Sequence, residues 1–218
     1  GGGIRRPLFF KRGHMDYVII LNGDKPALPP GFFRGKKVIC ADGAYSYAAE
    51  MGIEIELLIG DMDSLKYVPK MVNVARFPSD KDATDGQLAL DEAIKRGAEN
   101  IYIIGAAGGR DDHYMGNLIL LFRALKKGVS ARIITDHCDI FMFDRSVKFA
   151  VKKNYYLSIV PFGGLLHIMN TEGLKYRICD KVLSLDETLG ISNVTTADNV
   201  YIEVKSGCGI AYVTHEQI

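Results

Sequence analysis

Two short apolar runs, each followed by aspartates and a glycine, constrain the fold of this chain more than any other feature. The run at 38–40 leads to Asp42, and the run at 57–59 leads to Asp61 and Asp63. Continuous apolar runs of this kind are typical of buried parallel strands, and open α/β sheets bind ligands at the carboxyl ends of their strands. The three carboxylates would gather at one sheet edge and repel one another unless a cation binds between them. The first hypothesis is therefore a site for Mg²⁺ and phosphate at this edge.

Strands and helices alternate through the first 145 residues. Apolar, β-branched segments predict the strands, and between them apolar residues recur at helical spacing. The predicted strands lie at 17–21, 38–41, 57–59, 72–77, 101–104, 131–135 and 140–143; the predicted helices lie at 44–51, from Ser79 or Asp80 to about 97, and at 114–125. This alternation indicates βαβ units with right-handed crossovers. We expect an α/β domain with a mainly parallel, Rossmann-like sheet in three layers.

The pattern changes near Val147. From there, short apolar segments are separated by glycine or polar turns and show no helical period, which is typical of an all-β sandwich or partial barrel. Residues 1–14 are basic, glycine-rich and without periodicity, and we expect a leader that is disordered or derived from a vector. The predicted domains are the leader at 1–14, an α/β catalytic domain at 15–145 and a C-terminal β-sandwich domain at 146–218.

Net charge and cysteine usage argue against several classes of protein. A formal net charge of +1 gives no overall field for nucleic acid or an anionic membrane, and no apolar run approaches the ~20 residues of a membrane span. The four cysteines lie far apart and form no CxxC pair. Buried thiols in a reducing compartment explain this spacing better than disulfides or a zinc site, which predicts a cytoplasmic protein.

A second acidic segment, 78–85, strengthens the hypothesis of a metal–phosphate site. By itself the segment 60–64 fits an aspartate-rich surface turn as well as it fits a metal site. The second segment contains three acids, a lysine and a threonine at a predicted helix start: Asp80, Asp82, Asp85, Lys81 and Thr84. Capping and charge–dipole attraction, worth up to ~1 kcal/mol per acid, need fewer acids than this. A lysine that binds phosphate and an acid that accepts a proton would explain the excess.

The glycine-rich segment 105–113 runs from a predicted strand into a predicted helix. Gly108 and Gly109 let the backbone approach an anion, and the helix N-terminus offers free N–H groups. Arg110 provides a planar fork for phosphate. The spacing fits neither the P-loop nor the dinucleotide fingerprint GxGxxG, which argues against a Walker-type ATPase and a dehydrogenase. We interpret His113 as a phosphate donor or a structural residue, while a role as base stays open.

Three residues of the predicted β-domain lie beside glycine turns: Tyr176, Ser192 and Asn193. An aromatic ring and two polar side chains could stack on a flat heterocycle and hydrogen-bond to it. Taken alone, ordinary hairpin chemistry explains them better.

Taken in order, these segments resemble the thiamin pyrophosphokinase family over nearly the whole chain after residue 14. The matching segments are Asn22–Asp24, Cys40–Ala44, Gly60–Ser64, Asp80–Asp85, Gly105–His113 with Asn117, Gly173–Tyr176 and Ser192–Asn193. Each segment is short, but the ordered set is specific. The resemblance implies an α/β domain followed by a β-sandwich. It also implies transfer of a diphosphate from ATP to the hydroxyl of thiamin, with Mg²⁺ as cofactor and AMP as the second product.

The resemblance further implies roles for individual residues. The catalytic group would be Asp61, Asp63, Asp85 and Lys81, and its three aspartates would bind Mg²⁺. The nucleotide-binding group would be Asn22, Gly23, Thr84, Gly108, Gly109, Arg110, Asp112 and His113. The thiamin-binding group would be Asp42, Tyr176, Ser192 and Asn193. Because the family works as a homodimer with thiamin at the subunit interface, the last three would act in the partner's site. The domain at 15–145 would bind the nucleotide and Mg²⁺, and the domain at 146–218 would bind thiamin and form the dimer.

The sequence leaves several alternatives open. The family often has a tryptophan where this chain has Tyr176, whose ring offers less area for stacking on thiamin. Either Asp85 or Asp63 would accept the hydroxyl proton. A diphosphokinase for another heterocyclic alcohol, such as a hydroxymethylpterin, is the second interpretation, and a non-catalytic nucleotide or thiamin sensor is the third.

Overall fold

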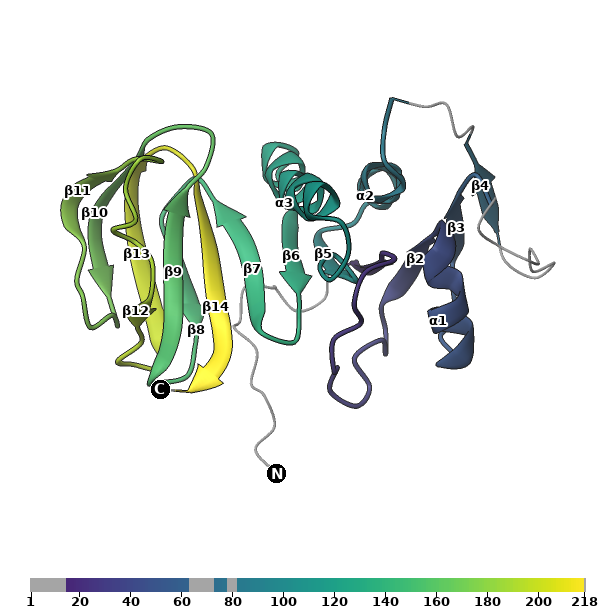
Figure 1. Cartoon of the computed structure of the whole chain (residues 1–218), viewed down its shortest axis with the longest axis horizontal. Helices are drawn as coiled ribbons and strands as arrows, with labels where there is room; N and C mark the ends of the chain where they lie inside the picture. Colours follow the sequence, from purple (N-terminus) through teal and green to yellow (C-terminus); the bar gives the residue numbers. More distant parts are fainter. Residues whose placement is uncertain (1–14, 63–72, 78–81, 218) are drawn as a thin grey trace. The chain divides into compact units, whose positions relative to one another are not determined.

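The computed structural model describes residues 15–62, 73–77 and 82–217 (Figure 1). The predicted leader at 1–14 and two predicted site residues, Asp63 and Lys81, lie outside the described residues. The chain forms two compact units that divide between Thr135 and Asp136. The functional domains 15–145 and 146–218 stay predictions, because compactness alone assigns no function.

A parallel sheet forms the centre of the first unit. Its strands run in the order β6-β5-β1-β2-β3-β4, and each neighbouring pair is parallel. The strands are β1 (Asp16–Ile20), β2 (Lys37–Ala41), β3 (Leu57–Gly60), β4 (Val74–Arg76), β5 (Asn100–Ile104) and β6 (Ser130–Ile134). All residues of β3 and β5 are buried. Burial on both faces explains why these strands are continuous apolar runs, and the predicted α/β class with a mainly parallel sheet is confirmed.

Three α-helices and one 3₁₀ helix accompany this sheet within the described residues: η1 (Asp42–Ala44), α1 (Tyr45–Glu50), α2 (Asp85–Lys95) and α3 (Asp111–Lys126). α2 packs against β1, β2 and β3, and α3 packs against β6 and α2. The helix predicted to start after Ser79 or Asp80 begins at Asp85 instead. Thr84 caps it, since its Oγ1 accepts a hydrogen bond from the Gln87 N–H at 3.2 Å. The Rossmann-like, three-layer arrangement stays a prediction.

The second unit is built from strands in the part that the structure describes. One antiparallel sheet has the order β12-β9-β14-β7, and the other has the order β11-β10-β13-β8. The strands are β7 (Cys138–Phe143), β8 (Val147–Ala150), β9 (Tyr155–Pro161), β10 (Leu166–Glu172), β11 (Cys179–Leu183), β12 (Asn193–Val194), β13 (Asn199–Ser206) and β14 (Gly209–Gln217). Both sheets contribute to one buried apolar core. In it Phe141 and Phe149 pack edge to face with ring centroids 5.1 Å apart. The all-β prediction is confirmed.

β7 differs from the sequence prediction in the unit to which it belongs. The sequence predicts the run 140–143 as a last strand of the first half, whereas β7 pairs antiparallel with β14 in the second unit. An apolar run predicts a strand without naming its partner. Here the partner lies at the far end of the chain, where periodicity carries no information about pairing.

The strand order creates a switch point between β1 and β5. From β1 the chain continues to β2, β3 and β4 on one side, and β5 and β6 follow on the other side. Backbone hydrogen bonds join the two segments that leave these strands: Leu21 N–H to Ile104 O at 2.9 Å and Gly23 N–H to Gly105 O at 2.8 Å. Ligands of open α/β sheets bind at such a point, beyond the carboxyl ends of the strands.

Candidate active site

A cavity of about 570 Å³ opens at this switch point. Its wall combines the residues that follow β1, β2 and β5 with the first turns of α2 and α3. Nine of the predicted site residues line it: Asn22, Gly23, Asp42, Thr84, Asp85, Gly109, Arg110, Asp112 and His113. Gly108 and Asp61 are described but are not part of its wall. The cavity therefore unites residues from separate sequence segments.

Glycines allow the segments after β1 and β5 to lie against each other. A Cβ on Gly23 would come within 2.1 Å of the Ala107 carbonyl oxygen. Gly108 has a φ of 78°, and a Cβ there would lie 1.8 Å from the Asp24 carboxylate. Close approach of the Ala107 backbone explains Gly23, and a positive φ beside the Asp24 side chain explains Gly108, before any ligand is considered.

A similar close approach brings the ends of β2 and β3 together. Ala41 and Ile59 are register partners in the parallel pair, and a Cβ on Gly60 would lie 2.6 Å from the Asp42 Cβ. Asp42, with a φ of 20°, therefore lies beside the residue that precedes Asp61. The expectation that these acids gather at one sheet edge holds for the two that the structure describes.

Within the described residues, no group of three His, Cys, Asp or Glu side chains is arranged to hold a metal ion. Mg²⁺ usually takes one or two carboxylates and completes its shell with phosphate oxygens and water. Asp85 lies on the cavity wall, and Asp61 follows Gly60, which lies against Asp42 of the same wall. The donor set thus fits Mg²⁺ bound together with a phosphate ligand, while the predicted trio Asp61, Asp63 and Asp85 stays a prediction.

Arg110 and Asp112 form a two-armed ion pair at the cavity. Arg110 Nε donates to Asp112 Oδ1 at 3.0 Å, and Nη2 donates to Oδ2 at 2.6 Å. The bond from Arg110 lowers the pKa of the Asp112 carboxyl, and the carboxylate in turn raises the pKa of the guanidinium. Both side chains are exposed, at 73% and 64%, so the pair adds little stability and its partners can exchange.

One face of α3 lines the cavity. His113 and Asn117 are one helical turn apart and both lie on the wall, together with Gly116. Asn117 Nδ2 donates to the Ala106 carbonyl oxygen at 2.9 Å, which ties α3 to the segment after β5. In the sequence, Asn117 stands out only as part of a motif. The i, i+4 spacing from His113 would have placed it on the same face.

Lys25 is a cation beside the site that was not predicted from the sequence. Its Nζ donates to the Gly23 carbonyl oxygen and lies 5.5 Å from the centroid of the Tyr47 ring. A Cβ on Gly105 would come within 3.0 Å of this Nζ. Burial lowers the pKa of the Lys25 ammonium. No motif marks this lysine, because only the fold brings it against the loop after β5.

Cys40 is a core thiol, as the sequence predicted. It is fully buried in β2, and burial raises the pKa of its thiol to about 12. A thiol that stays protonated is a poor nucleophile. Cys40 therefore has a packing role next to the site.

Comparisons with known proteins match both units. A family model described as "Thiamin pyrophosphokinase, catalytic domain" matches residues 33–133. A second, described as "Thiamin pyrophosphokinase, vitamin B1 binding domain", matches residues 144–208. Between them these matches cover most of the chain. The chain belongs to the thiamin pyrophosphokinase family.

Individual relatives agree with this assignment. A thiamine pyrophosphokinase of Bacillus subtilis is 35% identical over 120 residues, which are 54% of this chain and 56% of that protein. The chain thus spans about half the length of this relative. Thiamine pyrophosphokinase 1 of Oryza sativa subsp. japonica is 24% identical over 218 residues, 85% of this chain and 82% of that protein.

A solved structure of thiamine pyrophosphokinase from Bacillus subtilis shares the fold. It superimposes with a TM-score of 0.83 at 26% identity and covers 91% of this chain and 98% of its own. Yeast thiamin pyrophosphokinase shares the fold as well, with a TM-score of 0.74 at 17% identity over 94% of this chain and 87% of its own.

The predicted thiamin-binding residues of this family member lie in its second unit, apart from Asp42 on the first. Tyr176 is 59% exposed, whereas Asn193 is 5% exposed. Ser192 is exposed and has a φ of 57°. All three fall within the residues that match the vitamin B1 binding model.

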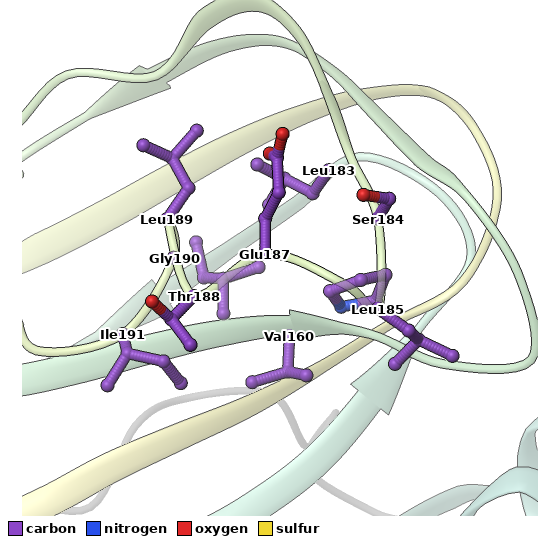
Figure 2. Close-up of a pocket in the computed structure, with 11 residues that line it drawn as sticks. Val160, Leu183, Ser184, Leu185, Glu187, Thr188, Leu189, Gly190 and Ile191 are labelled. Carbon is purple, nitrogen blue, oxygen red and sulfur yellow. The ribbon is translucent and has the colours of Figure 1, made fainter.

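A smaller cavity of about 200 Å³ also lies in the second unit, beside β9 (Figure 2). Its wall is formed by Ile159–Pro161 of β9 and by residues of the segment 183–191. Leu185, Leu189 and Ile191 are exposed there, at 65%, 55% and 48%. Figure 2 shows Leu185 and Leu189 at opposite ends of this wall. The leucines of this segment carry no motif in the sequence, although the segment lies in the domain predicted to form the dimer.

The part of the chain that the structure describes contains no helix of the length and hydropathy that crossing a membrane requires.

Proposed function

We propose that this chain transfers a diphosphate from ATP to the hydroxyl of thiamin and releases AMP, with the switch-point cavity as its active site. The chain is then an enzyme, a thiamin diphosphokinase, in keeping with its family. The composition of the cavity wall is the observation that supports this function best. Two helix N-termini, a glycine-lined loop and Arg110 converge on one cavity, in a chain whose two parts match two domains of one family.

ATP binds, in this proposal, with its phosphates at the N-termini of α2 and α3. Free backbone N–H groups and the helix dipole attract phosphate at such ends. Arg110 exchanges Asp112 for phosphate oxygens, because its ion pair is exposed and weak. The proposed nucleotide-binding residues are Asn22, Gly23, Thr84, Gly108, Gly109, Arg110, Asp112 and His113, with Lys81 at the same phosphates.

Mg²⁺ accompanies ATP in this proposal. Three carboxylates line the cavity, those of Asp42, Asp85 and Asp112, and they would repel a triphosphate. When bound, Mg²⁺ neutralises this charge and that of the phosphates. The proposed ligands are Asp61, Asp63 and Asp85.

In this proposal, residues of the chain align the reactants and accept the proton of the thiamin hydroxyl. The thiamin hydroxyl attacks the β-phosphorus, a bond forms between this oxygen and phosphorus, and the bond to the α-phosphate oxygen breaks. Such transfers depend mainly on in-line positioning and on charge stabilisation. Lys81 and Arg110 stabilise the charge on departing AMP, and Asp85 or Asp63 accepts the hydroxyl proton. Asp85 suits this role because it stands on the cavity wall as the first residue of α2.

Thiamin binds, in this proposal, between two copies of the chain, which form a homodimer. Asp42 contacts it from one copy, and Tyr176 and Ser192 act from the second unit of the other; Asn193 is treated below. The exposed Leu185, Leu189 and Ile191 support a dimer, because apolar side chains that gather on a surface usually mark an interface. The proposed function involves neither nucleic acid nor membranes, and it places the protein in the cytoplasm.

An assay of AMP release tests this function. The protein is incubated with ATP and Mg²⁺ and with one alcohol at a time: thiamin, a hydroxymethylpterin or none. We expect AMP and thiamin diphosphate with thiamin alone, and loss of both on chelation with EDTA. AMP only with the pterin would support the second interpretation. Ligand binding without AMP from either alcohol would support the sensor.

Asp85→Asn provides the matched test of the site. We expect it to reduce turnover by about two orders of magnitude, since it removes a proposed metal ligand and proton acceptor. Asp91→Asn is the control, because Asp91 lies on the same helix but pairs with Arg123 and is not part of the cavity wall. Equal turnover in the two variants would refute the assignment of Asp85.

A further inference from the structure

Tyr176 carries an exposed aromatic ring on a segment that belongs to no strand or helix. The residue is 59% exposed, and β11 begins only at Cys179. A ring on an untied segment would sample several orientations. The backbone of Tyr176, however, is tied to Asn193 at the start of β12.

The Asn193 amide holds both backbone groups of Tyr176. Its Oδ1 accepts hydrogen bonds from the N–H of Tyr176 at 3.0 Å and from the N–H of Val194 at 2.8 Å. Its Nδ2 donates to the Tyr176 carbonyl oxygen at 2.6 Å. An amide side chain has two acceptor and two donor positions, so these three bonds use both acceptors and one donor. Since Asn193 is 5% exposed, little of its surface is accessible to a substrate.

Backbone contacts on both sides extend this connection. The Lys175 N–H donates to the Val194 carbonyl oxygen at 2.8 Å, and the Thr196 N–H donates to the Gly173 carbonyl oxygen at 2.8 Å. Gly173 has a φ of 78°, and a Cβ there would lie 2.3 Å from the Asn199 carbonyl oxygen. Hydrogen bonds therefore hold the segment 173–176 alongside the segment 193–196.

We propose that Asn193 is a positioning residue, which holds the Tyr176 ring ready to stack on thiamin and does not contact the substrate itself. Only the identity of the stacking ligand rests on the proposed function. A ring that is ordered before binding loses less conformational freedom on binding, and this raises affinity. Asn193 thus acts on thiamin through Tyr176, whereas the sequence suggested a direct contact.

The motion of the ring tests this inference without any substrate. The chain has no tryptophan, so Tyr176→Trp introduces a single indole, which can be excited separately from the tyrosines. Time-resolved anisotropy then measures its local motion. We expect Asn193→Ala in this background to increase the amplitude of nanosecond motion roughly twofold. Unchanged motion would overturn the inference.

Asn100→Ala in the same background is the matched control. Asn100 is also 5% exposed, and its Nδ2 donates to Asp16 Oδ1 at 2.7 Å in the first unit. This variant removes an equally buried amide elsewhere, and we expect the motion of the introduced indole to stay as in the Tyr176→Trp parent. If it rose as much as in Asn193→Ala, the effect would be one of general stability and the inference would fail.

The unmodified chain gives a second test, which holds even if Asn193→Ala does not fold. Hydrogen exchange reports on the Tyr176 amide, whose N–H donates to Asn193 Oδ1. We expect exchange at least about tenfold slower than for an unprotected amide, in spite of the exposed side chain. Exchange at the unprotected rate would overturn the inference.

Kinetics then separates positioning from the proposed function. In the parent enzyme, Asn193→Ala should raise KM for thiamin about tenfold, with kcat within about twofold and KM for ATP unchanged. Greater ring motion with an unchanged KM for thiamin would overturn the link between positioning and substrate. A protein that is inactive with thiamin would refute the proposed function, and the fluorescence and exchange measurements would still decide the role of Asn193.

Discussion

The two units of this chain present their predicted ligand-binding residues in different ways. In the first unit the cavity wall is largely backbone and helix ends, and glycines let neighbouring loops approach each other closely. In the second unit one buried side chain, Asn193, holds an exposed ring through hydrogen bonds to its backbone. The first arrangement follows from strand order, and the second follows from hydrogen bonds between the segments 173–176 and 193–196.

This difference has a chemical reason. Phosphate is recognised by N–H groups and charge, which loops and helix ends provide at a sheet edge. A flat heterocycle needs a ring face at a defined angle, so an aromatic side chain must be held in place. Changes in the first unit should therefore act through backbone geometry and charge, and changes in the second through the order of exposed side chains.

The reactivity of the cysteines should show the largest contrast between the units. Cys40 lies buried beside the cavity with a thiol pKa of about 12, whereas Cys179 is exposed on the second unit. Alkylation requires thiolate and access, so iodoacetamide at about pH 8 should modify Cys179 at least about a hundredfold faster than Cys40. Peptide mass spectrometry over time measures both rates. Comparable rates would mean that the first unit opens at the site.

Gly23→Ala should destabilise the first unit strongly. Its Cβ would meet the Ala107 carbonyl oxygen at 2.1 Å, so the segments after β1 and β5 must separate. We expect a loss of about 3 kcal/mol in the free energy of unfolding, measured by chemical denaturation. Gly109→Ala is the matched control: apart from its neighbours in the chain, a Cβ there would have no heavy atom of the described residues within 4 Å, so the unfolding free energy should stay nearly unchanged. Equal losses would contradict the role of close backbone approach.

Arg110→Ala should reduce kcat/KM for ATP by about a hundredfold, because a charged two-pronged donor is lost from the phosphate site. Arg110→Lys should recover only part of this, since an ammonium lacks the planar fork. Arg123→Ala is the control: Arg123 lies on α3, directly before which Arg110 stands, and pairs with Asp91 at 2.7 Å, but it is not part of the cavity wall. An unchanged kcat/KM in Arg110→Ala would remove Arg110 from the nucleotide site.

The apolar segment of the second unit should show the smallest of these effects. Leu185→Glu and Leu189→Glu place charges on its exposed surface and should weaken the proposed dimer about tenfold each. Sedimentation velocity over a range of concentrations measures the dissociation constant. Leu165→Glu is the control, as Leu165 is 62% exposed on the same unit but outside this segment. A parent chain that stays monomeric would contradict the homodimer itself.

Local patterns in the sequence were enough to predict much of the first unit and of its cavity. Continuous apolar runs predicted its strands, because burial on both faces of a parallel sheet leaves no alternation. Aspartates and glycines at the ends of these runs predicted a polar edge, and nine of the predicted residues line one cavity there. The ordered motifs also predicted the family.

The tertiary structure alone decided which segments meet. β7 pairs with β14, which follows it only near the end of the chain. The Lys25 ammonium lies against the loop after β5, and the Asn193 amide binds the backbone of Tyr176. Each contact joins residues far apart in the chain, between which local propensity and periodicity carry no information. The sequence by itself therefore determined the elements and the kind of chemistry at their ends. Strand order and long-range hydrogen bonds decided how the cavity is closed and what holds the aromatic ring.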